Sequence, residues 1–533
     1  MISKTGTDFD IVLISAEEYE DHPLSPVGVI ARVLDSQGYH VGIVETPKGK
    51  DDIGRLGVPK LFWGITSGSI DSMLNNYTPL KRSRLEDEHS DAKPMPDRAL
   101  IVYANWIKQV SKTAPIVLGG IEASLRRFAH YDYWNNDIRR CLLFDTRADI
   151  LVYGNGEKQV LEIASRLKEG RDCIGIRGTC IRAREVPQGF ELLPSYKEVV
   201  SDKKAFCKMT VALSNRKDLA QGYDNNFILQ YKYPDYTTAD LDWIFSLGFK
   251  RDLRRGSTLE LARFSVVTHR GCLGRCNFCS LALHQGDKVI SRSEQSILDE
   301  VSGFSKVPGW KGFVDDLGGP SANMYGMDCE KGCDRGCIGC KNLDVSHSRL
   351  LELMRKVRSI PGVKKVFVRS GIRYDLALES REYVKELSEH HISGTLKIAP
   401  EHFDKEVLAL MNKDNSRLDE FVDLFNKLND HKGQSLRYYL MIGHPGEDEV
   451  KVQALKTKAV KLGNIEHFQM FTPTPMSISS CMYWTGLDPF TLKPVKVVYD
   501  YHTKKQLKRI MLGGIEEAHD HDKENPPQRR NRR

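Results

Sequence analysis

Short apolar runs alternate with amphipathic stretches along the first 165 residues of the chain. Strands that are covered on both faces of a parallel sheet are continuously apolar and often end at glycine turns. Five runs have this character: Phe9–Ser15, His40–Glu45, Lys60–Ile65, Pro115–Leu118 and Asp149–Tyr153. An amphipathic helix is expected over Val27–Ser36. This alternation predicts an α/β fold with a Rossmann-like open sheet domain over residues 1–168.

Residues 169–258 show no clean period, so we expect a connecting segment there. A second regular pattern begins near Leu261, with helical stretches such as Ser348–Ser359 and Ser380–His390 between apolar runs. Six runs are strand candidates: Phe264–Thr268, Gly312–Leu317, Lys365–Ser370, Thr395–Ala399, Arg437–Ile442 and His467–Thr472. They predict a (β/α)6 partial barrel over residues 259–480, followed by a C-terminal extension over 481–517. In such barrels the chemistry lies at the carboxyl ends of the strands.

The chain has 533 residues, of which 40% are hydrophobic and 28% charged, enough for more than one packed domain. Four arginines in Arg529–Arg533 supply more than half of the net charge of +7, so nucleic-acid binding by the folded body is not indicated. Residues 518–533 are expected to form a disordered basic tail. No run approaches the roughly 18 apolar residues of a membrane span, and no signal-peptide pattern begins the chain. We therefore expect a cytoplasmic protein without a membrane partner.

Seven of the twelve cysteines fall within 69 residues, a clustering that favours metal binding over a secreted disulfide scaffold. Cys272, Cys276 and Cys279 are separated by three and then two residues, directly after the first predicted barrel strand. Thiolates are the usual ligands of iron–sulfur clusters, and a cubane with only three of them keeps one iron free for an exchangeable ligand.

This triplet after a first barrel strand resembles the signature of the radical S-adenosylmethionine (SAM) superfamily. The resemblance implies a [4Fe–4S] cluster on Cys272, Cys276 and Cys279, with SAM on the open iron. It also implies reductive cleavage of SAM to a 5′-deoxyadenosyl radical, hence a flavodoxin-like or ferredoxin-like electron donor. Phe278 matches the hydrophobic position that such proteins pack near adenine.

Other barrel positions are similar to the superfamily's SAM contacts. Gly318 and Gly319 match a Gly-Gly-Glu motif, although Pro320 stands where the glutamate would be, which leaves a side-chain contact there in doubt. Ser370 and Arg373 are candidate contacts for the ribose or carboxylate, with a structural turn and a surface charge as the alternative. Gly443 resembles a glycine edge that approaches adenine, and its alternative is a plain strand-ending turn.

Four longer motifs resemble the YgiQ family of radical SAM proteins, and the likeness runs over residues 8–485. The motifs are Tyr19–Pro23, Val117–Arg127, Asp316–Tyr325 and Leu396–His402. The family's reaction is unassigned, so the resemblance gives no substrate. Within the last motif, Glu401 and His402 could form either an acid–base pair or a structural one.

A second cysteine group follows, with spacings of three, three and two residues: Cys329, Cys333, Cys337 and Cys340. Four thiolates suit an auxiliary iron–sulfur cluster or a structural zinc site equally well, and free thiols are the remaining alternative. The flanking cations Lys331, Arg335 and Lys341 would offset the negative charge of such a site.

The N-terminal domain resembles the cobalamin-binding domains that precede many radical SAM barrels, through Gly119-Gly120 and Gly154–Glu157. The Asp-x-His-x-x-Gly pattern is absent, because Asp21 and His22 are adjacent. We expect kinship of fold without cobalamin. Two alternatives stay open: a cobalamin-dependent radical SAM methyltransferase, and a non-catalytic module that binds zinc or nucleic acid.

Overall fold

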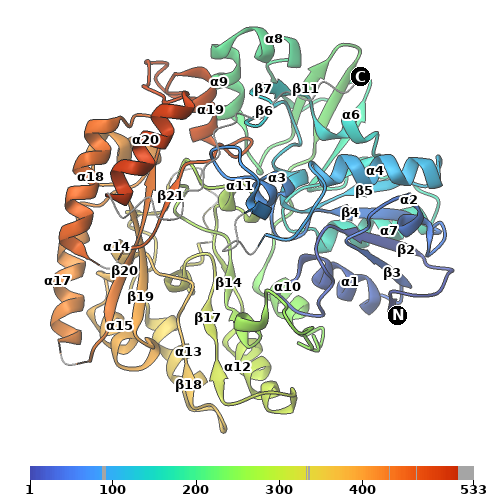
Figure 1. The fold of residues 1–533 in the computed structure, drawn as a ribbon. Helices are drawn as coiled ribbons and strands as arrows, with labels where there is room; N and C mark the ends of the chain where they lie inside the picture. The colour runs from blue at the N-terminus through green and yellow to red at the C-terminus, as the bar shows by residue number, and fades with distance from the viewer. Residues whose placement is uncertain are drawn as a thin grey trace.

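The computed structural model describes residues 1–86, 92–329, 331, 333, 336–430, 432–463 and 465–513. The tail predicted over 518–533 lies outside these residues. Figure 1 shows the N-terminal sheet domain, from blue to green, beside a yellow to red barrel. The predicted α/β class, with an N-terminal sheet domain before a barrel of alternating strands and helices, is confirmed. None of the described helices combines the length and the apolar character that a membrane crossing requires.

The N-terminal sheet has ten strands in the order β1-β3-β2-β4-β5-β8-β9-β12-β11-β10. Its parallel part consists of β1 (Ile2–Ser3), β3 (Val41–Glu45), β2 (Ile11–Ser15), β4 (Phe62–Thr66), β5 (Ile116–Leu118) and β8 (Ile150–Val152). All five predicted strands of this domain are present. In β2 every residue is buried, the expected result for a strand covered on both faces.

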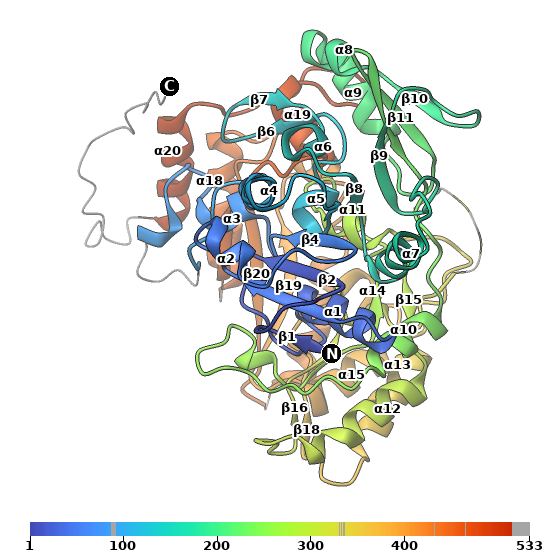
Figure 2. The ribbon, with the colours of Figure 1, turned by 90° about the vertical axis from the view of Figure 1, so that its right-hand side faces the viewer.

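Residues 169–258 are not the expected connecting segment, because they extend the same sheet. The added strands are β9 (Thr179–Ala183), β12 (Asn226–Gln230), β11 (Leu219–Tyr223) and β10 (Glu191–Leu193). The pairs β8–β9, β9–β12 and β11–β12 are antiparallel, and Figure 2 shows this part of the sheet beside α8 (Tyr196–Ser201) and α9 (Lys203–Ala212). Strands β9 and β10 carry exposed residues, so they lack the continuous apolar run of the parallel strands.

Helices cover both faces of the sheet. On one face α1 (Pro26–Ser36) packs beside α7 (Glu157–Lys168), and on the other α4 (Ala99–Val110) packs beside α2 (Lys50–Gly54) and α6 (Leu142–Thr146). Helix α1 begins at a cap in which the Ser25 side chain accepts from the Gly28 N–H, with Pro26 in the first turn. The remaining helices here are α3 (Ser72–Asn76), α5 (Gly120–Ser124) and α10 (Thr238–Phe245), and β6 (His130–Asp132) and β7 (Asp137–Arg139) form a hairpin.

The barrel wall consists of parallel strands at all six predicted places. They are β13 (Ser265–Val267), β16 (Phe313–Val314) with β17 (Asp316–Gly318), β18 (Lys365–Val366), β19 (Thr395–Glu401), β20 (Ser435–Ile442) and β21 (Ile465–Met470). The second predicted strand is thus split at Asp315. A small antiparallel pair, β14 (His269–Arg270) with β15 (Ile290–Ser291), follows the first strand.

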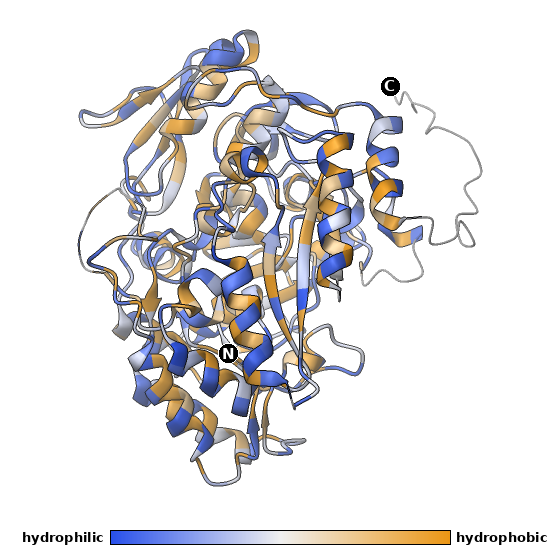
Figure 3. Cartoon of the chain, turned by 90° about the vertical axis from the view of Figure 1, so that its left-hand side faces the viewer, coloured by the Kyte–Doolittle hydropathy of each residue, from blue (hydrophilic) through white to orange (hydrophobic). Residues whose placement is uncertain are grey.

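Helices surround the barrel, and those on the side seen in Figure 3 carry both hydrophilic and hydrophobic residues, as amphipathic helices do. Helix α17, for example, buries Leu418, Phe421 and Phe425. The helices are α11 (Leu281–Gln285), α12 (Glu294–Gly303), α13 (Ser348–Arg358), α14 (Tyr374–Ala377), α15 (Arg381–Glu386), α16 (Lys405–Met411), α17 (Leu418–Asn429) and α18 (Glu449–Leu462).

Of the C-terminal helices, α19 (Ile478–Thr485) packs on the N-terminal domain, and α20 (Tyr501–Leu512) packs on α18 of the barrel. Helix α19 packs on α9, where the Sγ atoms of Cys481 and Cys207 lie 3.7 Å apart. The Nζ of Lys504 in α20 donates to the hydroxyls of Tyr483 at 2.6 Å and Tyr133 at 3.1 Å. The two C-terminal helices therefore connect the sheet domain to the barrel.

Candidate functional site

The cysteine triplet lies on the loop between β14 and α11, at the carboxyl end of the first barrel strand. Gly271 begins this loop with φ of +84°, and a Cβ there would lie 1.8 Å from the Lys288 carbonyl oxygen, so only glycine fits. Asn277 fastens the loop to α16, because its backbone N–H donates to the Met411 carbonyl at 2.9 Å and its Nδ2 to the Leu410 carbonyl at 2.9 Å. Hydrogen bonds of the chain itself thus hold the loop in place.

Cys272, Cys276 and Cys279 line one cavity of about 310 Å³. Phe278, from the same loop, lines it as well, and its ring lies 6.4 Å from the ring of His444. Further walls come from the segment after β18, from β19 and β20, and from the turn after α16. They include Ser370, Arg373, Asp375, Lys397, Ile398, Glu401, Lys413 and Tyr439. The three thiols predicted to act together therefore open onto a common space at the carboxyl ends of the strands.

Positive charge faces these thiols. Burial raises the pKa of the Cys279 thiol to about 12. Burial also raises the pKa of Cys272, and the Arg373 guanidinium and the Lys413 ammonium oppose that rise. Burial disfavours the charged form of Arg373. The Asp375 carboxylate, whose Oδ1 lies 3.0 Å from Arg373 Nε, and the neighbouring thiols have the larger effect, so the pKa of Arg373 is raised. The cavity therefore pairs sulfur donors with two cations that favour their thiolate forms.

This donor set suits an iron–sulfur cluster with one open iron. In the described part of the chain, no three or more His, Cys, Asp or Glu side chains are gathered closely enough to hold one metal ion. A cubane takes each thiolate on a different iron, so its ligands need not converge on one point as the four ligands of a zinc ion do. Three cysteines of one loop that line one cavity are thus a ligand set that a cluster can use.

Two residues of the Asp316–Tyr325 motif position the segment with Ser370 and Arg373. The Oδ1 of Asp316 accepts from the N–H groups of Arg369 at 2.6 Å and Ser370 at 3.2 Å. Asn323 is fully buried, and its Oδ1 accepts from the Arg373 N–H while its Nδ2 donates to the Arg373 carbonyl, each at 2.9 Å. Neither side chain stands out in the sequence, because each binds backbone 50 or more residues along the chain.

The glycines that were expected to contact SAM do not line the cysteine cavity. Gly318 and Gly319 line a neighbouring cavity between the two domains, not the cysteine cavity. The Gly443 N–H donates to the Glu447 carboxylate, and Gly443 lines neither of these two cavities. A Cβ at Gly443 would meet Met470 at 3.4 Å, an ordinary contact distance. Gly443 thus lies in a turn that ends a strand, which was the alternative to a contact with adenine.

Glu401 and His402 face different partners. Glu401 lines the cysteine cavity, and its Oε1 accepts from the Lys413 Nζ at 3.1 Å. His402 is fully buried, with its Nε2 2.9 Å from Glu447 Oε1. The two residues are therefore not an acid–base pair with each other. Lys413, which completes the cavity, follows no motif or spacing that would mark it in the sequence.

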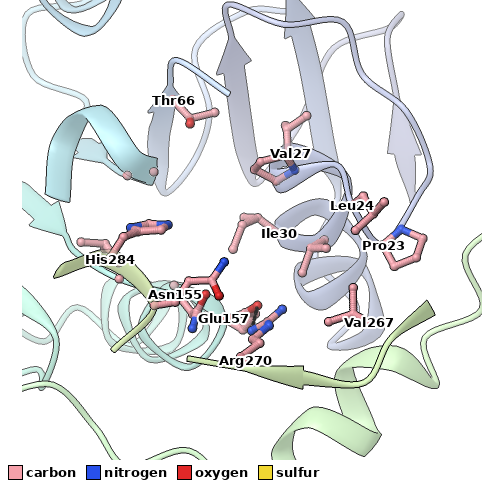
Figure 4. A pocket seen from close by; sticks show the side chains of 18 of the residues that line it. Pro23, Leu24, Val27, Ile30, Thr66, Asn155, Glu157, Val267, Arg270 and His284 are labelled. Atoms are coloured by element: carbon pink, nitrogen blue, oxygen red, sulfur yellow. Dashed lines mark ion pairs between the residues drawn. The ribbon is translucent and has the colours of Figure 1, made fainter. Parts of the chain in front are cut away.

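The cavity between the domains has a volume of about 510 Å³. Figure 4 shows Leu24, Val27 and Ile30 on the side of the N-terminal domain, facing Val267 and Arg270 of the barrel. Its sheet edge is formed by the glycine turns after β5 and β8, which include Gly119, Gly120, Gly154 and Gly156. These turns lie at the carboxyl ends of parallel strands, where ligands of open α/β sheets bind.

This cavity is mainly apolar, and its polar side chains include an ion pair and a buried histidine. Arg270 and Glu157 form an ion pair of 2.7 Å across the domain boundary. His284 Nδ1 lies 2.9 Å from Ser124 Oγ, and burial lowers the pKa of His284 to about 4, which keeps the ring neutral. The walls also include Leu281, Pro320 and Ser370, which line the cysteine cavity too. The two cavities are therefore neighbours with a common wall.

The second cysteine group lies between the Asp316–Tyr325 motif and α13. Cys333 is exposed, and Cys329, Cys337 and Cys340 are partly buried. The structure describes all four residues, whereas Arg335 lies outside the described residues. Of the flanking cations, Lys331 donates to Asn342 Oδ1 at 2.9 Å.

The chain matches two family models and several known proteins. A family model described as Radical SAM N-terminal matches residues 1–261, and one described as Radical SAM superfamily matches residues 266–458. A UPF0313 protein of Fusobacterium nucleatum is 40% identical, over 94% of this chain and 95% of that protein. A UPF0313 protein of Methanocaldococcus jannaschii is also 40% identical, over 96% of this chain and 90% of that protein.

Among solved structures, the chain is similar to the radical S-adenosylmethionine methyltransferase TsrM from Kitasatospora setae, with cobalamin and a [4Fe–4S] cluster bound. The TM-score is 0.51 at 16% identity, over 86% of this chain and 74% of that one, a likeness that shows the fold alone. The UPF0313 relatives cover nearly the whole chain at 40% identity, and the two family models match both domains. These matches show common family membership as well as a common fold. The chain is an enzyme of the radical SAM class and belongs to the UPF0313 (YgiQ) family.

Proposed function

We propose that this enzyme cleaves SAM reductively at a cluster held by Cys272, Cys276 and Cys279 and acts on a substrate of still unassigned class. One observation carries the proposal: these three thiols line a single cavity together with Arg373 and Lys413 at the carboxyl end of the barrel. When bound, a [4Fe–4S] cluster supplies an open iron for SAM and the electron that cleaves it to a 5′-deoxyadenosyl radical.

The side chains of the cavity have separable tasks in this proposal. Arg373 and Lys413 supply positive charge opposite the thiolates and the carboxylate of SAM. Phe278, Ile398 and Tyr439 provide apolar wall that excludes water from the reacting atoms. Asn323 and Asp316 act as positioning residues, because they hold backbone and do not line the cysteine cavity.

The test is anaerobic cluster reconstitution, followed by an assay for 5′-deoxyadenosine from SAM and dithionite. The wild-type protein should form it, and a Cys276→Ala variant should not. Cys173→Ser is the matched control, since Cys173 is partly buried and outside both cysteine groups. Absence of 5′-deoxyadenosine from wild type with a fully formed cluster would contradict the proposal.

A second candidate is a cobalamin-dependent radical SAM methyltransferase. It is favoured by the 510 Å³ cavity at the carboxyl edge of the N-terminal sheet, which shares a wall with the cysteine cavity. The solved structure that the chain resembles in fold has cobalamin bound, which weighs against the expectation of a domain without cobalamin. Catalysis of methyl transfer would then use both cavities.

Titration with hydroxocobalamin under anaerobic conditions tests this candidate. Saturable binding to wild type and its loss in an Ile30→Trp variant, which fills the cavity between the domains, would support it. Val450→Trp is the control, because Val450 is 78% exposed. If wild type binds no corrinoid at concentrations well above those of the protein, this candidate is excluded and the first stands.

A further inference from the structure

Two cysteines that belong to neither cysteine group meet where the C-terminal helix α19 packs on α9. The Cys481 thiol donates to the Cys207 sulfur across 3.7 Å, although the two residues are 274 positions apart in the chain. Both side chains are buried in the apolar core of the sheet domain. Figure 1 shows the two helices side by side. Tertiary folding therefore brings two thiols into direct contact at the junction of these helices.

The pair needs little movement to become a disulfide. A disulfide bond is about 2.05 Å long, so the two sulfurs would have to approach each other by roughly 1.7 Å. The helices that carry them already pack on each other. Rotation of the two side chains can therefore supply the approach without a large shift of the backbone.

The two thiols differ in reactivity. The hydrogen bond from the Cys481 thiol lowers the pKa of Cys207 to about 7. Burial, together with the same bond, raises the pKa of Cys481. The thiolate is the reactive form of cysteine. Cys207 is therefore the sulfur that reacts first with an oxidant, and Cys481 stands beside it to complete a disulfide.

The position of the pair suits a small oxidant. Cys207 lies on the inner face of α9, whose Lys203, Lys204 and Lys208 are exposed. Only one surface helix thus separates the Cys207 sulfur from solvent on this side. Local opening at the end of such a helix costs far less than unfolding of the protein.

Helix α19 connects this pair to the loop of the first cysteine group. The backbone N–H of Ser479, two residues before Cys481, donates to the Asn277 carbonyl at 3.0 Å. Asn277 stands between Cys276 and Cys279 in the sequence. One helix therefore contacts both the thiol pair and the loop that carries the expected cluster ligands.

We propose that Cys207 and Cys481 are a redox-active thiol pair that a hydroperoxide converts to a disulfide, and that this bond fixes α19 on α9. The Cys207 thiolate attacks one peroxide oxygen, the O–O bond breaks, and Cys207 becomes a sulfenic acid. The Cys481 sulfur then attacks the Cys207 sulfur, and the S–O bond breaks. With hydrogen peroxide, two thiols lose two electrons to one peroxide, and two waters leave. Neither thiol lines the cysteine cavity, so the proposal does not rest on SAM cleavage.

Peroxide treatment of the full-length chain, followed by peptide mapping, tests the proposal. After alkylation in urea and proteolysis without reductant, wild type should yield two peptides joined through Cys207 and Cys481, which dithiothreitol separates. Cys141 and Cys180 are equally buried and should be recovered in the alkylated form. Oxidation of the exposed Cys333 confirms that the reagent acted.

Two serine variants separate the roles of the sulfurs. Cys481→Ser should lose the joined peptide and accumulate a sulfenic acid at Cys207, which dimedone labels. Cys207→Ser should lose the joined peptide without such labelling of Cys481. Circular dichroism checks that both variants are folded. Free thiols at both positions of folded wild type, in a sample whose Cys333 is oxidised, would overturn the proposal.

Hydrogen exchange measures the effect of the bond on α19. Backbone amides of this helix should exchange severalfold more slowly in peroxide-treated wild type than in the same sample after reduction. Cys481→Ser treated in the same way should show no such difference, which separates the bond from other effects of peroxide. Complete formation of the disulfide with unchanged exchange in α19 would overturn the fixing of this helix.

Discussion

His402 Nε2 donates a hydrogen bond of 2.9 Å to Glu447 Oε1, and neither side chain is accessible to solvent. The direction follows from the other ring nitrogen, because Nδ1 accepts from the Asp404 N–H at 2.9 Å and so carries no proton. The second oxygen of Glu447 accepts from the Gly443 N–H. A single buried carboxylate thus joins the end of β19 to the turn after β20, between two walls of the barrel.

This arrangement predicts that Glu447→Gln is destabilising although it conserves shape. Two donors meet the two carboxylate oxygens, and glutamine offers only one acceptor and would set its NH2 group against a donor. We expect the free energy of unfolding to fall by about 1–3 kcal/mol in urea denaturation. Glu449→Gln, at an exposed position of the next helix, is the control. Equal stability of E447Q and wild type would show that the contact contributes nothing.

We predict that replacing Asn323 weakens SAM binding and leaves cluster binding unchanged. In Asn323→Ala the backbone of Arg373 loses both hydrogen bonds of its clamp, while the cysteine loop keeps its own. We expect unchanged iron content and SAM affinity weakened about tenfold, as loss of roughly one net hydrogen bond would cause. Equilibrium binding of SAM to the reconstituted protein measures this effect. Asn225→Ala, in an exposed turn, should leave both quantities unchanged.

We predict that a larger residue at position 319 would collide with the His269 ring and destabilise the protein. A Cβ at Gly319 would lie 2.5 Å from Cε1 of the fully buried His269 ring, so Gly319→Ala should lower the free energy of unfolding by about 1–3 kcal/mol through overpacking. Gly394→Ala is the control, because a Cβ there meets nothing within 4 Å. Adding His269→Ala should recover part of the loss in a double-mutant cycle. Strict additivity of the two substitutions would contradict the steric explanation.

Because some histidines are buried in the neutral form, we predict that the free energy of unfolding falls in mild acid. Burial, with help from Arg251, lowers the pKa of His22 to about 3, and burial lowers that of His444 to about 3. In the unfolded chain a histidine takes up its proton near pH 6.5. Between about pH 6.5 and 4 the unfolded state therefore binds more protons, and the free energy of unfolding falls as the pH falls.

His22→Gln removes one of these titrations and should make that decline shallower, by about 1.4 kcal/mol per pH unit for one fully neutral group. Urea denaturation at several values between pH 7.5 and 5 measures the slope. His40→Gln, at an exposed position, should leave the slope unchanged. A His22→Gln slope equal to that of wild type would mean that His22 takes up its proton as readily in the folded protein as in the unfolded chain.

The sequence predicts those elements whose burial shows in the local pattern. Strands such as β2 and β4 are covered on both faces, so their residues form continuous apolar runs. Strands β9–β12 were missed because β9, β10 and β12 carry exposed residues and most of the strand pairs here are antiparallel. Their place in the sheet follows from pairing with distant residues, such as Ile150 with Ile181, which a local pattern cannot show.

The same difference between local patterns and long-range contacts holds for the site. The spacing of Cys272, Cys276 and Cys279 on one loop predicts a common cavity, because short loops keep their ligands together. Lys413 and Asn323 reach the site through tertiary folding, and no local spacing records their partners. Glu401 and His402 are adjacent in sequence yet bind Lys413 and Glu447, since the two side chains leave the end of β19 in different directions.

Leu281, Pro320 and Ser370 form part of the wall of both cavities. A ligand that shifts these residues from one side changes the affinity of the other side, and thermodynamic linkage makes that effect reciprocal. The occupant of the cavity between the domains would thus set how tightly SAM is held, and SAM would set the retention of that occupant by the same factor. If ligands occupy both cavities, this shared wall would therefore couple the binding of one to the binding of the other.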